Sequence, residues 1–170
     1  IIQARDIVGR TSETELVLED DSTPPEITAP VSGGAVTAAD NSYVDLSFTE
    51  GVWSGPLRDG AVTAADLVVG INQSADYDGM NVQDIGLGAT DISVASVTKA
   101  DGTGDPLEGG ETTIRVWLDI IGLPDGFDTF DIAPASTTAG ATTAVYDHGT
   151  NVVGAGSTDV TLYDQKRPYV

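Results

Sequence analysis

Apolar and polar residues alternate over several short stretches of this chain, which is the pattern of strands with one buried face. The clearest case is 111–120, where Ile114, Val116, Leu118 and Ile120 are separated by polar or amphipathic residues. Seven further stretches show the same alternation over a shorter length, namely 14–19, 26–31, 43–50, 64–71, 91–99, 127–133 and 157–164. Glycine, proline and aspartate lie between them and predict tight turns. The pattern predicts an all-β fold, an immunoglobulin-like Greek-key sandwich of about eight strands.

One strand motif occurs twice, near both ends of the sequence. Residues 158–164 read TDVTLYD and are followed by Pro168, and residues 14–20 read TELVLED and are followed by Pro24. Two prolines, Pro24 and Pro25, force extended backbone after the first copy and prevent its ladder from continuing. We therefore expect an N-terminal arm and linker over residues 1–23 and the sandwich over residues 24–170.

Composition narrows the functional classes further. The chain has 27 acidic residues against 7 Lys and Arg, with a net charge of −20, so we expect it to bind neither nucleic acid nor anionic membrane. It has no cysteine, which excludes disulfides, zinc–thiolate sites and cysteine nucleophiles. No run of 18 apolar residues predicts a membrane-spanning helix. At 40% hydrophobic residues, the 170-residue chain can bury the core of one sizeable domain.

Several blocks, taken in order, resemble the bacterial immunoglobulin-like (cadherin-like) repeat domains of large cell-surface proteins. The blocks are YVDLSFTEGV (43–52), VTKADG (97–102), LEGGETTIRVWL (107–118), DIAPA (131–135), YDHGTN (146–151) and VTLYD (160–164). The resemblance covers residues 24 to 168 and implies an extracellular or cell-surface location. It also implies an adhesive or structural role in tandem arrays, and it does not imply enzymatic activity.

The doubled motif predicts self-assembly. A β-domain has one place for its closing strand, and this chain carries two candidates for it. The arm of one subunit would add a strand to the next, head to tail, and form a surface filament. The candidate donor residues are Ile7, Val8, Thr14, Leu16, Val17 and Leu18. The candidate acceptor residues are Val160, Leu162 and Trp117.

Two other functions fit the same sequence. The first copy of the motif would be the end of a preceding domain if the chain were one repeat of a tandem-repeat adhesin or S-layer-type protein. Alternatively, Trp53 and Trp117 would bind glycans on a host or cell surface if the chain were a secreted carbohydrate-binding module.

Three groups of acidic residues are candidates for binding Ca²⁺, because hard cations prefer several oxygen ligands in flexible loops. The first group is Asp76, Asp78, Asn81 and Asp84. The second contains Asp101 and Asp105, near Glu108 and Glu111. The third, Asp20 and Asp21 after Glu19, lies at the linker, where related modular proteins stiffen junctions with calcium. Catalysis is not expected, since His148 is the only histidine and no nucleophile motif is present.

Overall fold

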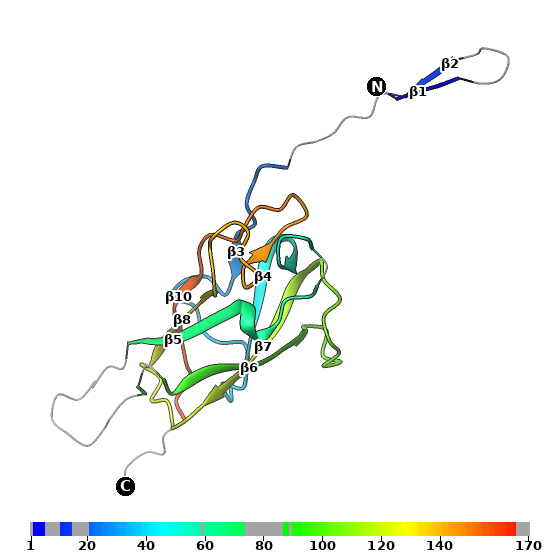
Figure 1. Ribbon diagram of the computed structural model, residues 1–170. Helices are drawn as coiled ribbons and strands as arrows, with labels where there is room; N and C mark the ends of the chain where they lie inside the picture. Colours follow the sequence, from blue (N-terminus) through cyan, green and yellow to red (C-terminus); the bar gives the residue numbers. More distant parts are fainter. Residues whose placement is uncertain are drawn as a thin grey trace, which may run out of the picture.

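The computed structural model describes residues 2–5, 11–14, 21–58, 60–73, 87–88 and 90–165, and confirms the all-β prediction (Figure 1). The only helix in this part is one 3₁₀ turn, η1 (Ala64–Asp66). No helix among these residues has the length and apolar character needed to cross a membrane. The strands are β1 (Ile2–Arg5), β2 (Thr11–Thr14), β3 (Ile27–Ala29), β4 (Tyr43–Ser54), β5 (Leu67–Gln73), β6 (Ile92–Lys99), β7 (Glu111–Ile120), β8 (Thr129–Pro134), β9 (Val145–Tyr146) and β10 (Ser157–Thr161).

Strands β3 to β10 form two facing antiparallel sheets. One sheet has the order β3-β4-β7-β6, with β9 attached to the end of β4, and the other has the order β10-β8-β5. In chain order these are the first, second, fifth and fourth strands against the seventh, sixth and third, leaving out the two-residue β9. Constant-type immunoglobulin domains arrange their strands in the same two sets.

The core lies between the two sheets and is filled by the inward half of each alternating pattern. Val44, Leu46, Ile114 and Val116 from one sheet are fully buried with Phe130, Ile132 and Val160 from the other. Burying aliphatic and aromatic surface in this way is the main stabilising term of such a domain. The residues of this core cluster, as far as the structure describes side chains, lie between 27 and 162.

Strand β10 closes its sheet, and the chain itself covers its outer edge. On one side β10 pairs with β8. On the other side, Gly33 N–H donates to the oxygen of Thr158 at 2.9 Å, and Thr161 N–H donates to the oxygen of Gly34 at 2.7 Å. The predicted acceptor residues Val160 and Leu162 are both fully buried in the core. Both edges of β10 are therefore paired within the protein, so β10 offers no free edge to a donated strand.

The polypeptide enters the sandwich at one end and leaves it at the other. Strand β4 runs from one end to the other, so its two ends serve as reference points (Figure 1). At the Ser54 end, the side chain of Asn151 contacts the linker at Asp21. At the Tyr43 end, the amide of Asn41 exchanges two hydrogen bonds with the backbone of Tyr163, where the chain leaves.

The first two strands form a hairpin of their own. Strand β1 pairs with β2 in an antiparallel register from Ile2 opposite Thr14 to Arg5 opposite Thr11. Figure 1 draws this two-stranded sheet well apart from the sandwich. Of the predicted donor residues, Thr14 ends β2, and Ile7, Val8, Leu16, Val17 and Leu18 lie outside the described residues.

Candidate cation site at the linker junction

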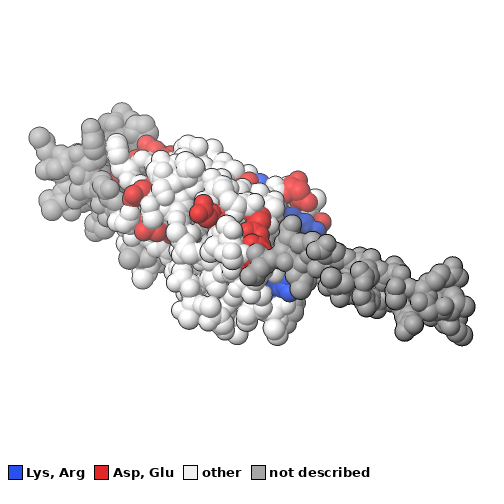
Figure 2. Space-filling view, turned by 90° about the horizontal axis from the view of Figure 1, so that it is seen from above, with Lys and Arg blue, Asp and Glu red and all other residues white. Residues whose placement is uncertain are grey.

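Three carboxylates meet where the linker reaches the sandwich. Asp21 belongs to the linker, Glu50 to β4, and Asp147 to the turn after β9. One oxygen from each lies within 4.8 Å of the other two. Within the described ranges this is the only group of at least three acidic or histidine side chains gathered so closely. Figure 2, a view from above Figure 1, shows more acidic than basic side chains on that face of the molecule.

Asp147 is held rigidly in this group. Its side chain is fully buried. Its Oδ1 accepts a hydrogen bond from the backbone N–H of Asn151 at 2.8 Å, and its Oδ2 accepts one from the Asn151 side-chain amide at 2.8 Å. Both donors are neutral, and neither ion pair seen in the described part of the chain includes Asp147. A buried carboxylate without a cationic partner is costly, and a bound cation would remove that cost.

Glu50 shows the mutual repulsion within the group. Burial raises the pKa of its carboxyl, and the negative charges of Asp147 and Asp21 raise that pKa further. The charged form of Glu50 is therefore disfavoured in the protein alone. A divalent cation among the three carboxylates would reverse this effect, because it attracts the charged form of each.

The linker is fixed to the same turn by its backbone. The side-chain amide of Asn151 donates to the backbone oxygen of Asp21 at 3.0 Å, in addition to its bond with Asp147. Gly149 leaves room for this approach, because a Cβ atom there would lie 2.7 Å from the backbone oxygen of Asp21. The turn thus places a linker carboxylate beside two carboxylates of the sandwich. Carboxylate oxygens are the ligands that Ca²⁺ prefers.

The other predicted calcium ligands do not gather in this way. Asp101 accepts hydrogen bonds from the backbone and hydroxyl of Thr103, and these bonds lower the pKa of Asp101. Asp105 lies in the same turn, where its backbone oxygen accepts from Lys99. These groups stabilise the turn between β6 and β7 rather than forming a cluster. Asp20, Asp76, Asp78, Asn81 and Asp84 lie outside the described residues.

Two residues of the junction were not predicted as ligands. Glu50 ends an alternating strand pattern, and Asp147 stands in a turn beside His148. The presence of an acidic residue at each position is therefore explained by the local structure, without a bound ion. Only the pairing of β4 with β9 brings them together, and that pairing has no local signal in the sequence. Asp21 was predicted, because an acidic residue before two prolines marks a linker.

Both tryptophans proposed as glycan contacts have partners within the protein. The Trp53 ring lies over Gly109 and Gly110 and makes an edge-to-face contact with His148 at 5.9 Å. Trp117 is half-buried; its indole N–H donates to Thr98 at 3.0 Å and its ring contacts Tyr43. Trp53 does line a shallow pocket with Leu57, Arg58 and His148.

Comparison of the chain with protein-family models, with curated proteins and with solved structures finds no match.

Proposed function

We propose that this chain is a structural subunit of an extracellular surface assembly, joined end to end to identical copies by its N-terminal arm. The observation that carries the proposal is the placement of the linker and the chain exit at opposite ends of the sandwich. A domain with this geometry transmits force along its strands and extends an assembly in one direction.

The strand order supports the structural role. The two sheets have the strand sets of constant-type immunoglobulin domains. The sequence blocks that resemble bacterial immunoglobulin-like repeats fall on β4, β6, β7, β8, β9 and β10 of these sheets. Fold alone does not imply function, so the proposal depends on the ends of the domain rather than on the sandwich itself.

The hairpin supports assembly through the arm. An isolated two-stranded hairpin is marginally stable in water. Strands β1 and β2 pair with each other in a two-stranded sheet of their own. Docking on another copy would supply the missing packing. Since the contact joins two different surfaces, it is head to tail, and without ring closure it produces a filament.

Ca²⁺ is proposed to stiffen the joint between arm and sandwich. Asp21, Glu50 and Asp147 would share the ion, so the linker would leave the sandwich in a fixed direction. Without the ion, repulsion among the three carboxylates would loosen the linker. Assembly would then be sensitive to chelators.

Deletion of residues 1–20 tests the proposal directly, because the described core lies wholly between residues 27 and 162. Light scattering coupled to size exclusion should show assemblies for the full chain and a folded monomer for the deletion variant. Assemblies of unchanged size without residues 1–20 would exclude assembly through the arm.

A second candidate, one repeat of a tandem array, is favoured by the same placement of the two ends. In that case the neighbouring domain would be covalently attached, and the isolated unit would stay monomeric with its arm intact. A concentration series of the full chain separates the two functions, since only a self-assembling subunit grows in mass with concentration.

A further inference from the structure

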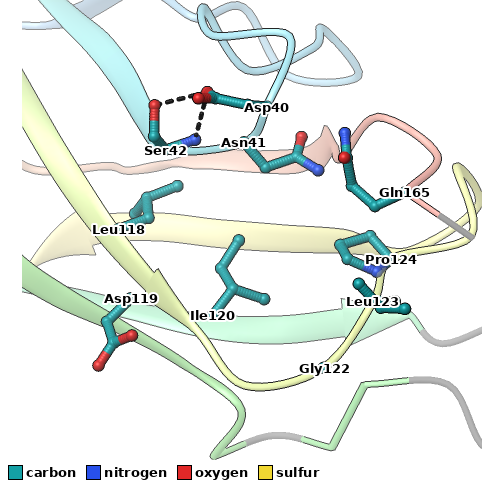
Figure 3. A pocket seen from close by; sticks show the side chains of 10 residues that line it. All are labelled: Asp40, Asn41, Ser42, Leu118, Asp119, Ile120, Gly122, Leu123, Pro124 and Gln165. Atoms are coloured by element: carbon teal, nitrogen blue, oxygen red, sulfur yellow. Dashed lines mark hydrogen bonds between the residues drawn. The ribbon is translucent and has the colours of Figure 1, made fainter.

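A groove lies at the end of the sandwich where the chain leaves (Figure 3). Its apolar part is formed by Leu118 and Ile120 of β7 with Leu123 and Pro124 of the following loop. Figure 3 shows Leu118 and Ile120 on the same side of β7, facing the loop that carries Asp40. With a volume of about 330 Å³, the hollow can accept a few side chains.

Exposed apolar side chains occur in the two segments that border this groove, and one of them, Leu123, lines it. Large apolar residues are exposed at seven positions of the described chain, and four of them are Ile121, Leu123, Phe127 and Tyr163. The loop with the first three is joined to the exit segment by the bond from Gln165 N–H to the oxygen of Pro124, 2.8 Å long. On a protein with a net charge of −20, exposed apolar side chains beside a groove make it a candidate interaction site.

The rim of the groove is acidic. Asp40 and Asp119 both border it and are exposed, and Figure 3 shows the Asp119 carboxylate on the side of β7 opposite to Leu118 and Ile120. Asp40 accepts hydrogen bonds from Ser42, which lower the pKa of its carboxyl and keep it charged. Neither residue takes part in the two ion pairs found among the described residues. The groove therefore suits a segment that combines apolar side chains with positive charge.

The N-terminal arm of this chain has that composition. Residues 1–10 contain Ile1, Ile2, Ile7 and Val8, and they also carry Arg5 and Arg10, two of the seven basic residues of the whole chain. We infer that the groove beside Leu118 and Ile120 receives the N-terminal arm of a second copy. The inference rests on the proposed function and names its acceptor surface. Because the linker at Asp21 and the groove lie at opposite ends of the sandwich, the contact is head to tail.

Charge exchange in the full chain tests the inference. Asp119→Lys should raise the dissociation constant for self-association at least tenfold, and so should Arg5→Glu with Arg10→Glu. Combining all three substitutions should restore much of the affinity, measured by sedimentation equilibrium. Asp105→Lys is the matched control, because it changes the net charge equally at an exposed turn between β6 and β7, and it should leave assembly intact.

Each other outcome overturns the inference in a distinguishable way. Assembly that needs residues 1–20 but ignores Asp119→Lys would retain the proposed function and reject this groove. In an Arg5→Lys variant, which gives the arm an amine, zero-length cross-links from residue 5 to Asp40 or Asp119 within one molecule, and none between molecules, would show that the arm occupies its own groove. A full chain that stays monomeric at all concentrations would reject both the groove and the proposed function.

Discussion

The side-chain amide of Asn151 donates a hydrogen bond to the backbone oxygen of Asp21 at 3.0 Å, and so ties the linker to the turn after β9. The same amide holds the buried carboxylate of Asp147 at 2.8 Å. Asn151→Ala removes both bonds, and we expect a loss of about 1–3 kcal/mol in the free energy of unfolding, because a buried acceptor loses a partner. Chemical denaturation measures this loss, and calorimetric titration should show weaker Ca²⁺ binding. Unchanged stability and unchanged Ca²⁺ affinity would show that Asn151 does not hold the linker or Asp147 in place.

Gly149 and Gly154 form a matched pair for testing how closely the linker approaches the turn. Gly149→Ala would place a methyl group 2.7 Å from the backbone oxygen of Asp21, whereas nothing lies within 4 Å of a Cβ at Gly154. We expect Gly149→Ala to destabilise the protein by about 1–3 kcal/mol through overpacking, and to weaken Ca²⁺ binding. Gly154→Ala should leave both quantities unchanged. Equal effects of the two substitutions would contradict this arrangement.

Glu50 gives the junction a defined pH dependence. Its pKa is raised in the folded protein, so in chelator the folded state binds this proton more tightly than the unfolded state does. Stability should therefore fall as the pH rises from the ordinary pKa of 4.5 through the raised value. Glu50→Gln should remove this part of the pH dependence and raise the melting temperature at pH 7 in chelator.

Calcium should reverse the order of the same two proteins. At a hundred times the dissociation constant, a single bound ion stabilises the folded state by about 2.7 kcal/mol. The protein with Glu50 should gain this amount, and the Glu50→Gln variant should gain less, as measured by calorimetry with and without Ca²⁺. Identical gains would show that Glu50 is not a ligand.

Arg115 stabilises the outer face of the β3-β4-β7-β6 sheet through its contacts with Asp45 and Tyr43. Its guanidinium binds both oxygens of Asp45, at 2.7 and 2.9 Å, and lies 3.8 Å from the centre of the Tyr43 ring. Arg115→Lys should cost about 1–3 kcal/mol, since an ammonium group cannot reproduce the paired geometry. Lys99→Met breaks an exposed pair with Glu108 and should cost clearly less, because solvent screens that pair. Denaturant midpoints of the two variants measure the two losses in the free energy of unfolding. Equal losses would contradict the structural role of the Arg115–Asp45 pair.

The sequence was sufficient for the strands whose apolar residues alternate without interruption. The range predicted for β7 is the one observed, and the predicted strand over 127–133 overlaps β8, whose Phe130 and Ile132 are buried in the core. The predicted strand over 64–71 begins later, because Thr63 and the buried Asp66 form a capping box around η1. Short apolar strands specify their own face but carry no information about distant partners.

The candidate cation site was less accessible to sequence analysis for the same reason. Asp21 was predicted from its linker context, whereas Glu50 and Asp147 are brought to it by sheet pairing. The predicted acceptor surface at Val160 and Leu162 lies in the core, since residues 33–36 already pair with the outer edge of β10. A repeated motif identifies similar strands, but it does not show which strand edge is free.

Negative-stain microscopy of the full chain, with Ca²⁺ and with chelator, tests the central claim most directly. The proposed function predicts unbranched filaments with Ca²⁺ and their shortening or loss on chelation. Dispersed single particles under both conditions, at concentrations where the protein is folded, would contradict end-to-end assembly.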